Sequence, residues 1–308
     1  MKTCPFFGIC GGCKYDFADG DYRTKKLAEL NNLPLTGSAI WTDIGTRRRA
    51  DFAFADGNFG LYQNKSKNIV PVRNCPVMRS EINDILPKLA KLPWGGAGSC
   101  LITVCDNGLD IAITSAVPYF SSEFKNAAEK LPNVIRVTWN ERTVMQTAVP
   151  SITFEGKSVE YPSGAFLQPT EESEKSLRDL VINHATGAKH TADLFCGLGN
   201  FTFALNADGF DIVGTGVKRD LFTHPLTVGM LAQYDCIVMD PPRAGAMSQC
   251  KELVKSTVPK IIYVSCNPTT WQRDANILTR GGYKLQTLIP VDQFVGSAHW
   301  ELFSVFTK

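Results

Sequence analysis

The chain has 308 residues, enough for two domains of ordinary size. Hydrophobic residues make up 44% and charged residues 20%, which excludes a disordered chain and a protein built of membrane spans. Lysine and arginine total 32 against 30 acids, so a net charge of +2 excludes a strongly basic binder but not a local basic patch. Because the first residues also lack a signal-peptide core, we expect a cytoplasmic protein with no membrane partner and no obligate protein partner.

The first 165 residues predict a mixed, β-rich domain. Residues 21–30 have the pattern of a short helix. Turn residues between apolar runs predict two hairpins, and two further runs predict single strands. The hairpins are expected at residues 48–54 with 59–62 and 100–104 with 110–114, and the strands at 134–139 and 152–154.

Beyond residue 165 helices alternate with short apolar strands, which is typical of a parallel α/β sheet. Thr170 followed by Glu171 and Glu172 predicts a helix start, and this helix should run to about residue 184. Strands are expected at residues 191–195, 211–213, 236–239 and 261–264, with 300–306 closing an antiparallel edge. We therefore divide the chain into domains 1–165 and 166–308.

The ten cysteines are unevenly spread, and three crowd the start of the chain. Disulfides rarely persist in a reducing cytosol, so this spacing favours a metal site together with thiol chemistry. The array Cys4-x5-Cys10-x2-Cys13, with Cys75 before a proline, supplies four thiolates. Spacing alone leaves zinc and an iron–sulfur cluster equally open, because both accept four cysteines.

Several motifs lie at strand ends of the second domain. Gly197 and Gly199 permit a tight turn at a nucleoside-bearing ligand, and Asp240 begins Asp-Pro-Pro-Arg, which places a carboxylate in the sheet crevice. Cys266 precedes a helix start, which favours a thiolate. Ordinary turns and an inert buried cysteine are the alternatives. The first two motifs favour an S-adenosylmethionine-dependent methyltransferase over a dehydrogenase. Glu301 is the only acid in its apolar run, for which a solvent-facing position is the simplest explanation.

The order of these motifs resembles the RNA 5-methyluridine methyltransferase family, whose members methylate uracil C5 in ribosomal and transfer RNA. The resemblance covers nearly the whole chain and implies a shortened, Rossmann-like class I methyltransferase domain behind an α+β iron–sulfur and RNA-binding domain. It makes Cys266 the nucleophile and Glu301 the general base. The S-adenosylmethionine contacts that it implies are Gln168, in Phe-Leu-Gln, and Phe195, Asn200, Asp220 and Asp240.

Uracil chemistry explains the need for both catalytic groups. C5 is a poor nucleophile until a thiolate adds to C6 and turns the ring into an enolate, which can then attack the methyl sulfonium. A base must afterwards remove the C5 proton so that the thiolate can leave. Amino-group methyltransferases have a similar motif that ends in an aromatic residue, on which the target base stacks. Asp-Pro-Pro-Arg ends in arginine instead, so methylation of an exocyclic amino group ranks lower.

The resemblance also implies a 4Fe–4S cluster on Cys4, Cys10, Cys13 and Cys75, with a structural role and zinc as the remote alternative. It places the basic stretch at residues 47–49 toward RNA phosphates. No β-barrel domain precedes Cys4, and together with the cysteine array this favours 23S ribosomal RNA over transfer RNA.

One departure from the family stands out. Asn200 and Asp240 are only 40 positions apart, although the family fold places a strand, a helix and a strand between them. The acid that normally ends the second strand and binds ribose hydroxyls is expected to be absent, with Gly214, Thr215 and Gly216 in its place. The competing hypothesis is therefore a degenerate iron–sulfur RNA-binding protein that has lost cofactor affinity.

Overall fold

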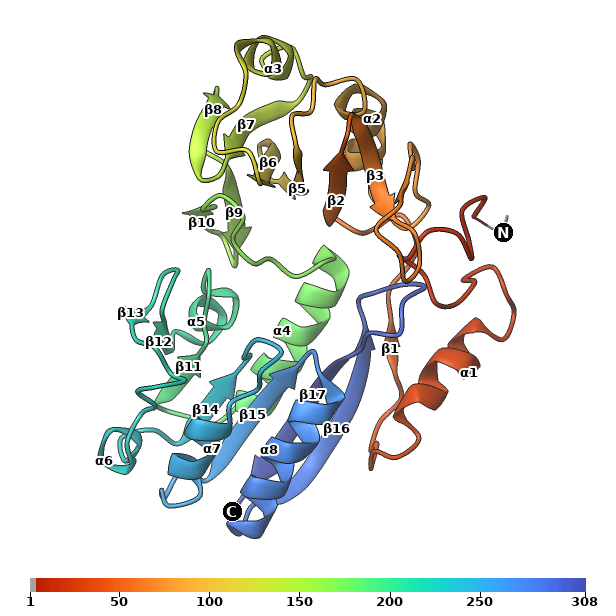
Figure 1. Ribbon diagram of the computed structural model, residues 1–308. Helices are drawn as coiled ribbons and strands as arrows, with labels where there is room; N and C mark the ends of the chain where they lie inside the picture. Colours follow the sequence, from red (N-terminus) through yellow and green to blue (C-terminus); the bar gives the residue numbers. More distant parts are fainter. Residues whose placement is uncertain (1–3) are drawn as a thin grey trace.

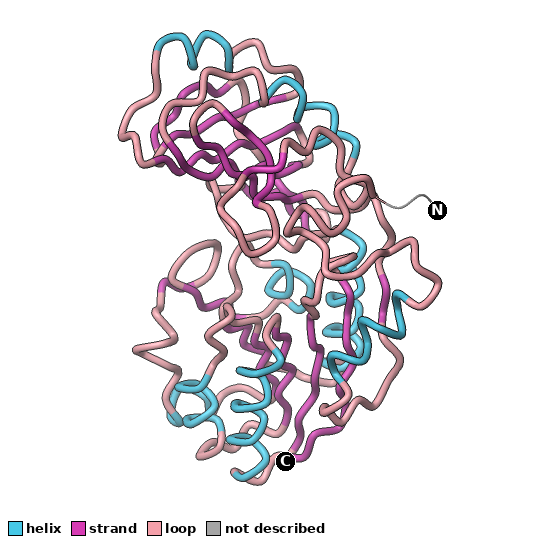
Figure 2. Tube along the Cα trace, turned by 45° about the vertical axis from the view of Figure 1, so that its right-hand side comes forward, coloured by secondary structure: helices cyan, strands magenta, loops and turns pink. Residues whose placement is uncertain are grey.

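Two large β-sheets, one in each lobe of the molecule, organise the chain in the computed structural model, which describes residues 4–308 (Figure 1). Figure 2 shows the two groups of strands separated by loops. The upper lobe contains a seven-stranded sheet in the order β4-β3-β2-β5-β6-β7-β8. Its strands are β2 (Arg49–Ala55), β3 (Asn58–Tyr62), β4 (Ile69–Val70), β5 (Ala97–Cys105), β6 (Gly108–Ser115), β7 (Val134–Trp139) and β8 (Arg142–Gln146).

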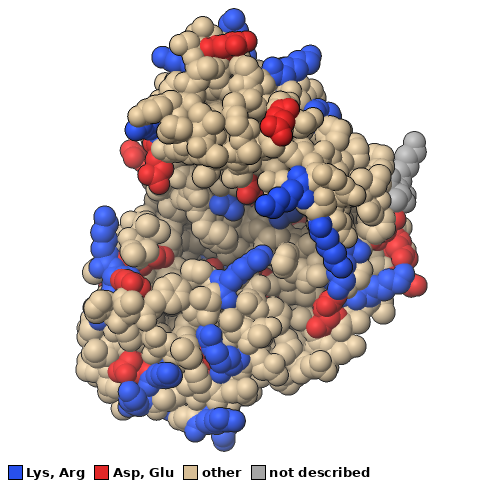
Figure 3. All heavy atoms as spheres, viewed as in Figure 1, with Lys and Arg blue, Asp and Glu red and all other residues tan. Residues whose placement is uncertain are grey.

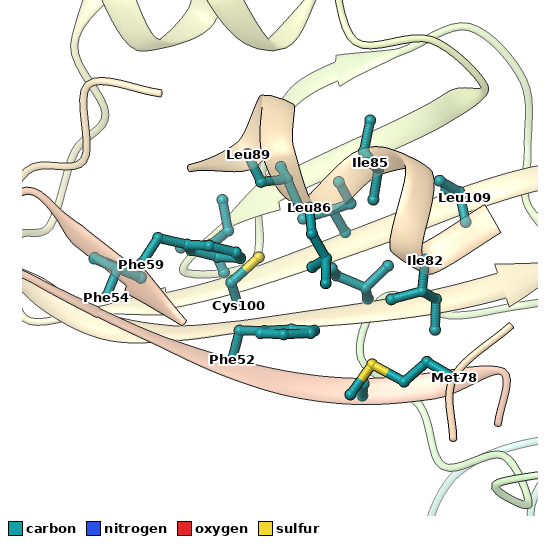
Figure 4. Packing of buried hydrophobic residues seen from close by; sticks show 14 of the residues in the cluster. Phe52, Phe54, Phe59, Met78, Ile82, Ile85, Leu86, Leu89, Cys100 and Leu109 are labelled. Atoms are coloured by element: carbon teal, nitrogen blue, oxygen red, sulfur yellow. The ribbon is translucent and has the colours of Figure 1, made fainter. Parts of the chain in front are cut away.

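The core of the upper lobe forms where α2 (Ser80–Leu89) and α3 (Ser122–Ala128) pack on this sheet. The apolar residues of α2 recur at helical spacing and face the aromatic side chains of β2 and β3 (Figure 4). The helix contributes Ile82, Ile85, Leu86 and Leu89, and the strands contribute Phe52, Phe54 and Phe59. This lobe therefore has a hydrophobic core of its own.

The lower lobe contains an eight-stranded sheet in the order β1-β16-β17-β15-β14-β11-β12-β13. The strands are β1 (Ile40–Trp41), β11 (Thr191–Leu194), β12 (Asp208–Asp211), β13 (Val217–Lys218), β14 (Cys236–Met239), β15 (Lys260–Ser265), β16 (Lys284–Asp292) and β17 (Glu301–Thr307). Only β17 runs antiparallel to its neighbours. From β11 the sheet extends through β12 and β13 on one side and through β14 and β15 on the other. In α/β sheets, ligands bind beside such a switch in strand order, at the carboxyl ends of the strands.

Helices cover both faces of the lower sheet because alternate strand residues point to opposite sides. In β14, Ile237 and Met239 pack on the face of α6 (Val228–Leu231), α7 (Met247–Leu253) and α8 (Pro268–Arg280). Cys236 and Val238 pack on the other face, which α4 (Glu171–Ala185) and α5 (Asn200–Leu205) cover. All four residues of β14 are buried, as the apolar run predicted.

The two predicted hairpins are confirmed as the antiparallel pairs β2–β3 and β5–β6. The predicted helix start at Thr170 is also confirmed, because the Thr170 hydroxyl accepts a hydrogen bond from the Ser173 amide at the first turn of α4. The expectation that residues 300–306 form a sheet edge is wrong. β17 lies between β15 and β16, and pairs with β16 from Glu301 to Thr307 and with β15 from Leu302 to Thr307.

The lobes do not separate at a single point in the chain. Residues 22–41, from the predicted N-terminal domain, belong largely to the lower lobe: α1 (Tyr22–Leu27) and η1 (Ala28–Leu30) precede β1, which pairs in parallel with β16. The hairpin of β9 (Ser151–Phe154) and β10 (Lys157–Glu160) lies between the lobes, and its apolar side chains pack with Leu198. None of the helices in the described part of the chain is long and apolar enough to cross a membrane.

The second and third strands of the lower sheet are present, so the expected loss of a strand–helix–strand unit is wrong in part. β12 and β13 pair in parallel, and residues 212–216 connect them without a helix. Parallel strands commonly need a connection of about a dozen residues or more. This tight return uses Gly214, with φ +95°, where a Cβ would lie 1.8 Å from the Gly197 carbonyl oxygen. Gly214 is therefore required by the short connection between β12 and β13.

Candidate functional site

A cavity of about 730 Å³ opens between the lobes, at the carboxyl ends of the parallel strands. Figure 3 shows this hollow, with basic side chains along its rim. Its volume is in the range of small-molecule sites, which is roughly 300–1,000 Å³. The cavity is lined by residues from the loops after β11, β12, β14 and β15, and by the upper lobe through Arg47 and Arg49.

Cys266 and Glu301 meet on the wall of this cavity. Ser265 and Leu302 are paired across β15 and β17, and Cys266 and Glu301 are the next residues beyond that pair. Glu301 is only 2% exposed, so the solvent-facing alternative is wrong. Its Oε2 accepts a hydrogen bond from Gln293, whereas its Oε1 is buried and has no partner among residues 4–308.

Burial is the largest cause of the pKa shifts of both groups. The pKa of the Cys266 thiol is raised to about 12, first by burial and then by the nearby charges of Glu301 and Asp240, while Arg243 acts in the opposite direction. The expected gain from the start of α8 is therefore outweighed. Burial and the charge of Asp240 also raise the pKa of Glu301, and the Gln293 hydrogen bond opposes them.

Asp240 and Gln168 meet on the floor of the cavity, as expected for two members of one site. The Gln168 amide donates to Asp240 Oδ2 at 3.1 Å, and the Gln168 Oε1 is buried without a partner among the described residues. Burial, aided by the charge of Asp211, raises the pKa of Asp240 to about 7, and the Gln168 bond opposes the shift. An orphaned carbonyl beside a carboxyl is a polar site suited to a ligand with hydrogen-bond donors.

Asp211 corrects the expectation that the second strand lacks a terminal acid. The strand begins earlier than expected, and Asp211 is its last residue and lines the cavity. Its Oδ2 accepts from the Gly197 amide at 2.8 Å, which ties the acid to the glycine turn after β11. Sequence reasoning missed this residue because it treated Asp211 as the start of a strand. The apolar Ile212 and Val213 that suggested a strand are exposed.

The other expected cofactor contacts differ in position. Phe195 lines the cavity, and its ring centroid lies 5.4 Å from that of Phe222. Asp220 also lines the cavity, but its carboxylate accepts from the Thr223 hydroxyl at 2.7 Å. Asn200 does not line it: its Oδ1 accepts from Arg178 at 2.9 Å on α4. The structure therefore brings Phe195 and Asp220 to the cavity and turns Asn200 away from it.

The basic stretch at residues 47–49 does not act as three equivalent cations. Arg48 is buried, and its guanidinium donates to Glu174 Oε1 at 2.5 Å and to the Gln168 carbonyl at 3.0 Å. Arg47 and Arg49 line the cavity, and the Nε of each is buried without a partner in the described chain. Arg47 forms isolated β-bridges with Met78 and Thr170, and Arg49 begins β2, so successive side chains here point to opposite sides. Two arginines face the cavity, and the third joins the lobes.

Cys4, Cys10, Cys13 and Cys75 lie near one another beside the upper core. The pKa of Cys13 is raised to about 12. Burial is the largest cause, and the charges of the other three cysteines add to it. The Gly12 amide donates to the Cys10 sulfur at 3.3 Å. Among residues 4–308, no group of three or more histidine, cysteine or acidic side chains is arranged to hold a metal ion.

Comparison with known proteins agrees with this geometry. A family model described as tRNA (Uracil-5-)-methyltransferase matches residues 226–308. The chain is 34% identical over 345 residues to an uncharacterized RNA methyltransferase of Agrobacterium fabrum, with 98% of this chain and 83% of that protein covered. It is 33% identical over 357 residues to a similarly named protein of Caulobacter vibrioides, at 99% and 86% coverage. The aligned stretches are longer than the 308 residues here, which fits a shortened member.

The fold is also similar to a solved structure. The Pyrococcus abyssi tRNA (uracil-54, C5)-methyltransferase in complex with S-adenosyl-L-homocysteine superposes with a TM-score of 0.73 at 18% identity, over 94% of this chain and 84% of that one. At this identity the likeness concerns the fold. The lower lobe is an α/β methyltransferase fold.

The raised pKa predicts that Cys266 is unreactive in the free protein. At pH 7 we expect iodoacetamide to modify Cys266 at least tenfold more slowly than an exposed thiol of pKa about 8.5, with the rate still rising above pH 9. Glu301→Gln should speed the reaction, because it removes a negative charge. Quantitative mass spectrometry of the Cys266 peptide, referenced to the denatured chain, measures both. A rate that levels off below pH 8 would contradict the assignment.

Proposed function

Because the chain belongs to the RNA methyltransferases and its residues 226–308 match the uracil-5 type, we propose that it transfers a methyl group from S-adenosylmethionine to C5 of a uridine in RNA. The observation that carries the proposal is the meeting of Cys266 and Glu301 on one cavity wall, at adjoining ends of neighbouring strands. A nucleophile and a base on one cavity wall are what addition to C6 and removal of the C5 proton require.

The residues present fit S-adenosylmethionine. The orphaned Gln168 Oε1 offers an acceptor, and Asp211 places a carboxylate beside the glycine turn, where ribose hydroxyls bind in sheets of this kind. The Asp211 carboxylate accepts from the Gly197 amide at Oδ2 and from the Ile212 and Val213 amides at Oδ1. A carboxylate has about four acceptor positions, so a position remains for a ribose hydroxyl. The argument for a degenerate RNA-binding protein depended on the absence of this acid. Asp211 therefore supports the enzyme.

The side chains divide the reaction between them. Cys266, once deprotonated, forms a bond to C6, and the electrons of the C5–C6 double bond move into the ring carbonyl as an enolate. S-adenosylmethionine would supply an electrophilic methyl group. C5 takes up this methyl as its bond to the sulfonium sulfur breaks, and S-adenosylhomocysteine is left. Glu301 takes the C5 proton at its unpartnered Oε1, the double bond returns, and the bond from C6 to Cys266 breaks to release the thiolate.

RNA is the substrate that the surroundings of the cavity favour. Arg47 and Arg49 on the upper side and Arg243 on the lower side line the cavity. Arginine binds phosphate through several donors at once. Because a uridine inside a helix cannot present C6 to a thiol, the base must first be unstacked into the cavity. Of the RNA classes, we favour 23S ribosomal RNA over transfer RNA on the cysteine array alone.

We further propose that Cys4, Cys10, Cys13 and Cys75 hold a 4Fe–4S cluster. The four thiols lie close enough together to influence one another electrostatically. Four cysteines suit zinc and a 4Fe–4S cluster alike, and the resemblance of the array to the family pattern is what favours the cluster. The Gly12 amide at the Cys10 sulfur is a contact that suits a cluster ligand.

Methyl transfer tests the proposed function. Anaerobically purified protein, radiolabelled S-adenosylmethionine, and ribosomal and transfer RNA lacking 5-methyluridine should give label in 5-methyluridine after nucleoside digestion. Cys266→Ala should abolish it, because no enolate can form, while Cys250→Ala, which removes a thiol from the core of the lower lobe, should retain it. Label on another nucleoside, or turnover by the Cys266 variant, would overturn the mechanism.

Asp211→Asn should weaken the binding of S-adenosylmethionine. Loss of a charge-assisted hydrogen bond costs about 1.5–3 kcal/mol, or roughly 10- to 150-fold in Kd. Asp208→Asn is the matched control, because Asp208 begins the same strand and bonds only to the Tyr234 hydroxyl at 2.9 Å. Titration calorimetry of both variants measures the difference. Equal Kd values in Asp211→Asn and the unaltered protein would refute the role of Asp211.

The cluster is tested by its metal content. The anaerobic protein should contain about four irons and absorb light at about 400 nm. Cys10→Ala should lose both the iron and this absorbance. Cys105→Ala, a buried cysteine between the lobes, should keep them. One zinc and no iron in the unaltered protein would replace the cluster with a zinc site.

A further inference from the structure

Glu301 is held by a single side chain. Gln293 donates its amide N–H to Glu301 Oε2, and the two residues are 1% and 2% exposed. Gln293 follows directly after β16, and Glu301 begins β17, so the contact spans the segment 293–300 that joins these strands. The second oxygen, Oε1, is left without a partner in the described part of the chain, on a residue that lines the cavity.

The direction of the Gln293 amide is determined by its other end. Gln293 Oε1 lies 3.0 Å from the Ser173 hydroxyl, and the Thr170 and Ser173 hydroxyls lie 2.6 Å apart. The Thr170 carbonyl, at 3.1 Å, is the other acceptor within reach of Ser173. A carbonyl oxygen facing a hydroxyl leaves the NH₂ group of Gln293 facing Glu301. Because Thr170 and Ser173 form the first turn of the 15-residue helix α4, this end of the chain of hydrogen bonds is rigid.

The hydrogen bond from Gln293 also opposes the upward shift in the pKa of Glu301. Burial and the charge of Asp240, after β14, raise this pKa, and the thiol of Cys266, after β15, is a further acidic group nearby. His299, Arg243 and Arg47 line the same cavity. Gln293 is neutral, and its N–H stabilises the carboxylate form of Glu301. A base must be ionised before it can take a proton, so this contact works in the direction that the reaction needs.

We propose that Gln293 is the positioning residue of the proton-abstraction step: it ties down one oxygen of Glu301, leaves the other free for the C5 proton, and is itself oriented by Ser173. The proposal rests on the proposed function. An amide neither gains nor loses a proton at neutral pH, so the proton taken by Glu301 cannot pass through Gln293 to Ser173. It must leave through the cavity, and the same hydrogen bond favours its departure.

Single-turnover kinetics isolates this step. If Glu301 is slow to take the C5 proton, the methylated uridine remains bonded to Cys266, and a protein–RNA adduct persists in denaturing electrophoresis. Gln293→Leu removes the donor at similar volume, and we expect the adduct to form at the normal rate but to decay about tenfold or more slowly. The acid limb of the pH profile of adduct decay should move to higher pH, because the carboxylate has lost its donor. Gln233→Leu, in the exposed turn after α6, is the matched control.

Ser173→Ala provides a second test that leaves the amide in place. It frees the orientation of Gln293, and we expect a smaller delay in adduct decay with the same direction of pH shift. If Gln293→Leu does not fold, Ser173→Ala alone decides the question. Decay at the unaltered rate and pH dependence in the folded variants would overturn the proposal, as would slower formation of the adduct with normal decay.

Failure of the inference and failure of the proposed function have different signatures. If the unaltered protein forms neither adduct nor 5-methyluridine with any RNA, the proposed function fails. If the unaltered protein is active and Glu301→Gln accumulates the adduct, but Gln293→Leu decays like the unaltered protein, then only the role of Gln293 is refuted.

Discussion

The buried ion pair of Lys26 and Asp292 holds the wall of the cavity in place. Lys26 Nζ donates to Asp292 Oδ1 at 2.6 Å and the Tyr22 hydroxyl to Oδ2 at 2.8 Å, with both charged side chains inaccessible to solvent. Burial lowers the pKa of Lys26, and the carboxylate opposes this shift. Removal of one partner from such a pair costs about 3–5 kcal/mol, because the other charge stays buried. Tyr22 and Lys26 belong to α1, and Asp292 is the last residue of β16. These bonds therefore attach α1 to the chain directly before Gln293.

The same segment receives support from the cysteine region. The amides of Lys14 and Tyr15, directly after Cys13, both donate to the Gly296 carbonyl, at 2.7 and 2.8 Å. From the other side, the Arg47 guanidinium lies 5.5 Å from the centre of the Phe294 ring. The upper lobe thus contacts the segment that leads to Glu301. A cluster on the four cysteines would act on the reaction through position, since the proposed chemistry transfers no electrons.

The cavity concentrates acids whose burial is unfavourable when they are charged. Burial raises the pKa of Asp193 and Asp240 to about 7 each and also raises that of Glu301 well above its usual value. Of these three acids, Asp240 and Glu301 line the cavity. Such clusters lower stability and are characteristic of functional sites. The neutral amides of Gln168 and Gln293 offset part of this cost by donating to Asp240 and Glu301 without adding charge.

Motifs whose chemistry is local were sufficient to predict the lower α/β sheet, the helix start at Thr170 and the position of Asp240 and Cys266 at strand ends of one crevice, because strand ends and turn residues carry these signals in sequence. Gln168 and Glu301 were assigned to the same site only through the resemblance to the family. Pairing between distant strands decided the rest. Only the sheet shows that β17 is central, that Asp211 ends β12 and that residues 22–41 join the lower lobe, because register and burial depend on which strands pair with one another. Packing also decides that Arg48 bonds to Glu174 while its two neighbours line the cavity, and that Gln293 donates to Glu301. The sequence determines which side chains are present, and the tertiary structure determines which of them face each other.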